Sequence, residues 1–189
     1  MDYLNQAKAA ARDSSAPGIG RNVQAMEAAE AHGHYTVDCY DADGNLKWSD
    51  KIENLVTTGG KNDALDKYLA GSAYTAAWYL GLVSATSYTT GAAAADTMAS
   101  HAGWAEDQNY SQATRPAPSF AAASAGSKAT SAAVAFSINA GTTIKGCFLT
   151  TVSTKGGTTG ILYSAGLFTG GDKVVAGGDT LNVTYTASL

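Results

Sequence analysis

The residues best suited to chemistry in this sequence lie in the stretch VDCYDADGNLKWSDKIENLVTTGGKNDALDKYL, residues 37–69. Three aspartates fall close together there, and a glycine and an asparagine follow them: Asp38, Asp41, Asp43, Gly44 and Asn45. Carboxylate and amide oxygens around a glycine begin a calcium loop of the EF-hand type, which also needs a late glutamate and a helix on each side. The Gly-Gly-Lys later in the stretch is a component of phosphate-binding loops.

The segments that flank the aspartates argue against an EF-hand. Apolar and polar residues alternate on both sides, as in Tyr35, Val37 and Cys39 before the turn, and this period of two is typical of half-buried strands. The late glutamate is also out of register. Because Asp-Gly and Gly-Asn tolerate positive φ, we expect residues 41–45 to form a hairpin turn, with a weak divalent-ion site as the alternative.

A phosphate-binding loop is also disfavoured by the spacing. Such a loop has a glycine five residues before its Gly-Lys pair and a serine or threonine after it. Here Leu55 stands at the first position and Asn62 at the second. We therefore expect a strand-to-helix turn that begins a short helix over residues 59–70.

Catalytic constellations are not evident either. Serine nucleophiles need an oriented base, and no GxSxG turn occurs. Glu106 and Asp107 are adjacent, so in an extended segment their side chains point apart. Two distant cysteines, Cys39 and Cys147, form neither a zinc site nor a disulfide framework, and we expect small buried thiols. The sequence contains three histidines, namely His32, His34 and His101. It thus predicts no enzyme, no cofactor and no metal site.

The elements that would position these residues are mainly strands. Apolar runs separated by Gly-Gly and Gly-Asp turns recur at short intervals, which is typical of an antiparallel sandwich or jelly roll. Further strands are expected at residues 78–83, 132–138, 144–152, 161–168 and 181–189. We predict an all-β fold: an antiparallel jelly-roll-like β-sandwich over residues 34–189, with one short helix.

Residues 1–33 differ from the rest in composition and are expected to form a separate N-terminal arm. Residues 2–12 and 21–32 favour helix, Pro17 interrupts them, and Gly33 would end the second helix. Neither segment has a wide apolar face, so each needs a surface to pack on. We expect an arm that becomes ordered when it docks.

Residues 84–118 form a long segment with weak periodicity. Loops of this length inside a compact domain are usually functional or partly disordered. Tryptophan, tyrosine and arginine are enriched at interface hot spots, so we expect interface residues here, namely Trp104, Tyr110, Arg115 and Pro116. The alternative is that the loop folds over the sandwich and its aromatic residues complete the core.

The overall composition narrows the classes of partner. Only 15% of residues are charged and the net charge is −4, without a Lys/Arg cluster, so we expect no nucleic-acid binding. No apolar run is long enough to span a bilayer, and the first residues, MDYLNQAKAA, do not resemble a secretory signal, so we expect no membrane partner. A surface rich in Ala, Gly, Ser and Thr favours packing against neighbours.

Three segments carry a resemblance to a known family. They are DGNLKWSDKIENLVTTGGKNDALDKYLAGSAYTAAWYLGLV, then DTMASHAGWAEDQNYSQATRP, then KGCFLTT with KGGTTGILYSAGLFTGGDKVVAGGDTLNVTYT. Together they resemble a family of tailed-bacteriophage virion proteins, over roughly residues 34–189. The resemblance implies a small, non-enzymatic structural protein similar to capsid cement or decoration proteins, which have a jelly-roll-like sandwich on the outside of the icosahedral shell.

This resemblance leads to a functional prediction. We expect a phage capsid cement protein that binds the exterior of the shell and bridges neighbouring major capsid subunits. Its partners would be the major capsid protein and itself, as a dimer or trimer, and its place the virion, assembled in the bacterial host cytoplasm. The alternative is a carbohydrate-binding adhesion module of a tail or head fibre, which would need Trp104 and Tyr110 to stack outward.

Overall fold

The computed structural model describes residues 30–69 and 77–189. In these ranges the chain forms ten strands and one helix, α1 (Thr58–Leu69). The strands are β1 (His32–Tyr40), β2 (Leu46–Val56), β3 (Tyr79–Ser84), β4 (Glu106–Asp107), β5 (Ser127–Ala129), β6 (Val134–Ser137), β7 (Thr142–Thr150), β8 (Leu162–Leu167), β9 (Lys173–Val175) and β10 (Thr180–Ser188).

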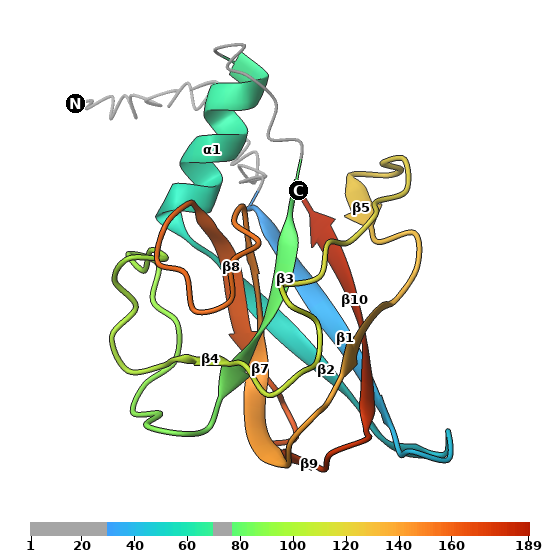
Figure 1. Ribbon diagram of the computed structural model, residues 1–189. Helices are drawn as coiled ribbons and strands as arrows, with labels where there is room; N and C mark the ends of the chain where they lie inside the picture. Colours follow the sequence, from blue (N-terminus) through green and yellow to red (C-terminus); the bar gives the residue numbers. More distant parts are fainter. Residues whose placement is uncertain (1–29, 70–76) are drawn as a thin grey trace, which may run out of the picture.

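All strands join in one antiparallel sheet that folds back on itself. The strand order is β4-β3-β7-β8-β2-β1-β10-β5, with β6 beside β10 and β9 beside β7. Strand β2 connects the two halves, because its first part pairs with β1 and its last three residues pair with β8. In Figure 1 the half that contains β3, β7 and β8 lies in front of the half that contains β1 and β10. The predicted all-β antiparallel sandwich with one short helix is confirmed, and the jelly-roll connectivity stays a prediction.

The core lies between these two halves. Strands β1 and β10 pair in register over their whole length, and alternate residues of both point inward. They meet the buried side chains of the facing strands β3 and β7 in one cluster that includes Val37, Val183, Leu80, Leu82 and Leu149. Burial of each such side chain contributes about 1.5–3 kcal/mol, so this cluster is the main source of stability.

A hydrogen bond also crosses the core between the two halves. The Tyr35 hydroxyl on β1 lies 2.6 Å from the Ser164 hydroxyl on β8. Burial raises the pKa of Tyr35 well above its ordinary value, and the neighbouring Tyr185 adds to this effect. The phenol therefore stays neutral and acts as a hydrogen-bonding partner inside the sandwich.

The N-terminal boundary differs from the expectation. Strand β1 begins at His32, and Gly33 pairs with Ala187 instead of ending a helix. Glycine is required there because a Cβ atom would collide with the backbone oxygen of Thr186 on the neighbouring strand. Glu30 and Ala31 are not helical. The rest of the predicted arm, residues 1–29, lies outside the described residues.

The turn at residues 41–45 is a hairpin turn between β1 and β2, as predicted. The Gly44 N–H donates to the Asp41 carbonyl at 3.0 Å, and Gly44 has a φ of 84°. The Asp41 carboxylate accepts hydrogen bonds from the backbone N–H groups of Asp43 and Asn45, at 3.0 and 2.8 Å. These bonds hold its pKa below the ordinary value. The carboxylate thus stabilises the turn itself.

Candidate docking surface

The long segment 84–118 folds over the sandwich. Three of the four residues expected at an interface are buried within the chain: Trp104 and Arg115 are 5% and 1% exposed, and Tyr110 is buried as well. Pro116 is half-buried, and its carbonyl accepts a hydrogen bond from Leu80 N–H at 2.9 Å. The burial of Trp104, Tyr110 and Arg115 favours the alternative, in which the loop completes the core, and an interface role for Pro116 stays a prediction.

An internal ion pair explains why Arg115 is buried. Its guanidinium binds Glu106 through two parallel bonds, Nε to Oε1 at 2.9 Å and Nη2 to Oε2 at 2.8 Å. Nη1 donates to the Val152 carbonyl at 2.9 Å, and Nη2 also donates to the Gly157 carbonyl at 3.1 Å. Such bidentate geometry offsets the desolvation of both charges. The pair anchors the loop to the segment that connects β7 to β8.

The aromatic residues of the loop contact the sandwich in the same region. Trp104 packs against Phe148 with ring centroids 5.5 Å apart, and its indole N–H donates to Asp96 at 3.0 Å. Tyr110 packs edge-on against Phe136 and donates to Glu106 at 3.3 Å. Both rings therefore have partners within the chain and offer no outward stacking platform.

A small cavity of about 210 Å³ remains beside this ion pair. His101 lines it, stacks on Trp104 with centroids 4.1 Å apart, and contacts the Trp104 carbonyl through Nδ1 at 3.0 Å. Among the described residues that line it, the charged side chains are Glu106 and Arg115, which neutralise each other. The cavity thus has no oriented nucleophile and base among the residues that line it.

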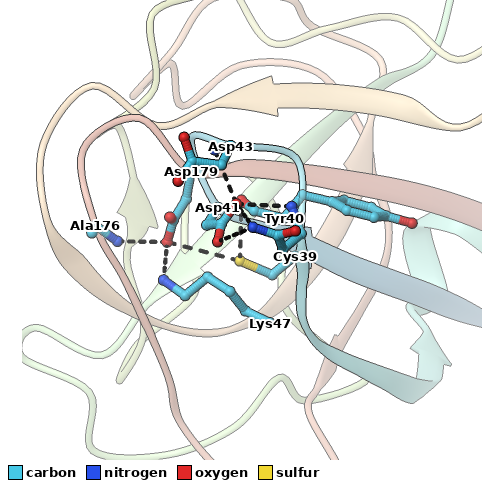
Figure 2. Close-up of polar contacts among 8 residues, drawn as sticks. Cys39, Tyr40, Asp41, Asp43, Lys47, Ala176 and Asp179 are labelled. Carbon is cyan, nitrogen blue, oxygen red and sulfur yellow. Dashed lines mark hydrogen bonds and ion pairs between the residues drawn. The ribbon is translucent and has the colours of Figure 1, made fainter.

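Figure 2 shows a second polar cluster, where the β1–β2 hairpin meets the turn before β10. The Asp179 carboxylate accepts from the Lys47 ammonium at 2.5 Å and from Ala176 N–H at 2.8 Å, and Cys39 Sγ lies 3.9 Å away. Burial alone would raise the pKa of Asp179, but these donors outweigh it and hold the pKa low. Burial, with the nearby Asp179 charge, raises the pKa of the Cys39 thiol to about 11. The cluster closes this end of the sandwich.

Metal ligands do not gather at the aspartate-rich turn. Within residues 30–69 and 77–189, no group of three or more His, Cys, Asp or Glu side chains is placed to hold a metal ion. Asp38 lies on β1, opposite Ser49 and Asn182 of its neighbours, away from the turn.

Helix α1 is the element that presents an uncovered apolar surface. It begins after Thr57, whose side-chain oxygen accepts a hydrogen bond from Gly60 N–H at 3.0 Å. The predicted helix over residues 59–70 is confirmed up to Leu69. Gly60 is buried against the Tyr163 backbone, where a Cβ atom would come within 2.5 Å of the carbonyl oxygen. In Figure 1 the helix rises beyond the ends of the strands.

The orientation of α1 is the reverse of that expected for a surface helix. Its Asp63–Lys67 ion pair, 3.0 Å long, is largely covered. Burial raises the pKa of Tyr163, and the nearby charge of Asp63 raises it further. The opposite side carries Leu65, Tyr68 and Leu69, which are 55%, 87% and 74% exposed. Apolar side chains at this spacing normally face a core. We call these three residues, with Leu189, the α1 face.

A groove of about 780 Å³ lies next to this face. Ala64, Leu65 and Tyr68 line one side, and Gly126 and Leu189 line the other. Leu189 is itself 77% exposed. Contiguous exposed apolar patches of a few hundred Å² mark interaction sites in proteins. This surface is therefore the candidate functional site.

From the sequence only a helix over residues 59–70 is predicted, and Leu65, Tyr68 and Leu69 lie within it. Their spacing predicts a helix with one apolar side, but spacing does not say whether the sandwich covers that side. The available signal was Gly60 at the helix start, which lets the first turn lie directly against the Tyr163 backbone.

Two further findings concern membranes and relatives. Among the described residues, no helix has the length and apolar character to cross a membrane. No protein-family model matches the sequence, and no curated protein matches it either.

Proposed function

We propose that the protein is a capsid cement protein of a tailed bacteriophage, which binds the exterior of the shell and bridges neighbouring major capsid subunits. Two things support this proposal. One is the resemblance of the three sequence segments to phage virion proteins. The other, which carries the proposal, is the α1 face, because an apolar helix side turned to solvent is suited to association with another protein surface.

The rest of the molecule supports a structural role. The sandwich has a well-packed core, and the long loop is fixed to it by the Arg115–Glu106 pair. A rigid body of this kind would lose little conformational entropy on binding. With only 15% charged residues, its surface would pack against neighbours with little desolvation of charge. Many weak, repeated contacts then add up over a shell.

The carbohydrate-binding alternative has less support. It needs exposed aromatic platforms, and its expected residues Trp104 and Tyr110 are both buried. Binding of host glycans therefore enters as an outcome of the test and not as a second proposal.

The test is co-sedimentation of the purified protein with emptied, undecorated capsids. Saturable binding at a fixed ratio to the major capsid protein, together with greater resistance of the shell to heat, is the expected result. The same protein with undecorated tails and with immobilised host glycans provides the comparison. Binding to tails or glycans, without binding to shells, would exclude the cement function.

A further inference from the structure

The cavity beside the Arg115–Glu106 pair has an apolar wall that suits a small ring. Met98, Trp104 and Phe148 line the cavity, and all three are buried. Aromatic rings and a methionine sulfur contact a further ring favourably, in offset or edge-on arrangements. Among the described residues, none lines both this cavity and the groove beside α1. The cavity is therefore a second site, separate from the α1 face.

The size of the cavity limits its ligand to about one ring. An apolar cavity of about 150 Å³ holds one benzene molecule, and this cavity measures about 210 Å³. Pockets for whole cofactors or drug-sized molecules are larger, roughly 300–1,000 Å³. A free molecule of one ring makes few contacts and binds weakly. A ring carried by a bound protein is held in place by the other contacts of that protein. The size thus favours an aromatic side chain of a partner.

The charges in the wall favour an uncharged ligand. Glu106 and Arg115, the charged side chains among the described lining residues, bind each other. The Glu106 carboxylate also accepts hydrogen bonds from the Tyr110 hydroxyl and from Gly156 N–H, so both of its oxygens are engaged. A charged ligand would therefore be buried without a counter-charge of its own, which is costly.

His101 supplies an acceptor for a hydroxyl group in this cavity. Its Nδ1 lies 3.0 Å from the Trp104 carbonyl oxygen, which can only accept, so the proton is on Nδ1. In a neutral imidazole Nε2 then accepts a hydrogen bond. Stacking on the Trp104 ring, with centroids 4.1 Å apart, fixes the orientation of the imidazole. The ring that fits the cavity therefore carries a hydrogen-bond donor.

Two exposed polar residues of the lining, Gln108 and Thr158, can bind the groups next to such a ring. Within residues 30–69 and 77–189 their side chains make no hydrogen bond. An amide and a hydroxyl group both donate and accept, so they suit the peptide groups that flank an inserted side chain.

We infer that the cavity binds one uncharged phenol ring, whose hydroxyl group donates to His101 Nε2, and that this ring is a tyrosine side chain of the protein that the α1 face contacts. Phenylalanine lacks the donor, and the indole of tryptophan is larger than one ring. The assignment to that partner rests on the proposed function, because bridging needs a second point of contact besides the α1 face.

The test of the site uses N-acetyltyrosine amide as the probe and the full chain labelled with ¹⁵N. Amide chemical shifts are followed by NMR at about pH 7.5, where imidazole side chains are mostly neutral. Saturable shifts at the residues that line the cavity are expected, with a dissociation constant on the order of 1–10 mM. N-acetylphenylalanine amide has the same ring without the hydroxyl group. It should bind about tenfold more weakly, although it is the more apolar molecule.

The variant His101→Phe tests the acceptor directly. It keeps an aromatic ring against Trp104 but removes Nε2, so the affinity for the tyrosine amide should fall about tenfold and that for the phenylalanine amide should not. His34→Phe is the matched control, because His34 lies on β1 and does not line the cavity. Thermal unfolding shows whether each variant is folded. If His101→Phe does not fold, the two amides on the unchanged protein still decide the question.

Three results would overturn the inference: no shifts at the cavity up to roughly 50 mM of the tyrosine amide, equal affinity for the two amides, or shifts at the α1 amides instead. The partner is tested by co-sedimentation with undecorated capsids. His101→Phe should bind the shells more weakly than His34→Phe, and equal binding of the two variants would refute the tyrosine of the shell as the occupant.

Failure of this inference is separable from failure of the proposed function. Binding to shells without binding of the tyrosine amide refutes only the phenol site. Binding of the tyrosine amide without binding to shells refutes the cement function, and with it the assignment of the tyrosine to the shell, while the phenol site stands.

Discussion

The buried pair of Arg115 and Glu106 gives the sharpest test of how the long loop is held. Glu106 accepts bonds from Arg115 Nε and Nη2, from the Tyr110 hydroxyl and from Gly156 N–H. The change Glu106→Gln keeps the shape but replaces one oxygen by an amide NH₂, which faces the donors Nη2 and Gly156 N–H. It also leaves the guanidinium buried without a counter-charge.

The expected loss of stability follows from this geometry. Removal of one partner of a buried, hydrogen-bonded ion pair costs about 3–5 kcal/mol. For a chain of this length, each kcal/mol lowers the thermal midpoint by about 2–4 °C, so a decrease of about 6–20 °C is expected. Replacing both partners with apolar residues, as in Glu106→Leu/Arg115→Met, should recover part of the loss, because no charge is then left unpaired.

The assay is urea and thermal unfolding followed by tryptophan fluorescence and circular dichroism. Glu53→Gln is the matched control, because Glu53 pairs with Lys51 at 2.7 Å but both side chains are exposed. An exposed pair contributes about 0–1 kcal/mol, so this variant should unfold close to the unchanged protein. If Glu106→Gln were no more destabilising than Glu53→Gln, the ion pair would not anchor the loop.

Three further predictions follow from other parts of the structure. Gly81→Ala should destabilise the protein by about 1–3 kcal/mol in urea unfolding, because a Cβ atom there would collide with the Phe148 ring; a neutral effect would contradict the packing. The pKa of Cys39 is about 11, so Ellman's reagent at pH 8 should react only as fast as the protein opens; rapid labelling of the folded protein would contradict its burial. The lowered pKa of Asp179 contributes stability that is present above the unfolded value of about 3.9 and is lost as the pH falls through the folded value. Asp179→Asn should therefore lose stability at pH 7 and show a weaker decline in acid; equal pH profiles for both proteins would refute this contribution.

The strands that could be predicted from the sequence are the longer ones, which show either a period of two or a continuous apolar run. Every second residue is buried along the whole of β1 and along β10 up to Tyr185, so the period of two is strong. Strands β4, β5 and β9 have only two or three residues and were not predicted. Their pairing is determined by neighbours far away in the sequence, such as β7 for β9, and such short segments show no period.

The loop shows a different limit of sequence interpretation. Tryptophan, tyrosine and arginine are common both in interfaces and in cores, so residue type did not distinguish the two possibilities. The deciding residue is Glu106, which lies nine positions before Arg115 and meets it only because both ends of the loop return to the sandwich. The expectation that Glu106 and Asp107 point apart is confirmed, since Asp107 instead accepts from the Thr142 hydroxyl at 2.6 Å.

Strand β2 has a mechanical consequence because it belongs to both halves of the sandwich and continues into α1. A force applied to α1 passes through Thr57 directly into a strand that is hydrogen-bonded to β1 on one half and to β8 on the other. Traction along that strand loads these bonds together, in shear, whereas peeling would break them one after another. Load on the helix is thus distributed over both halves of the sandwich at once.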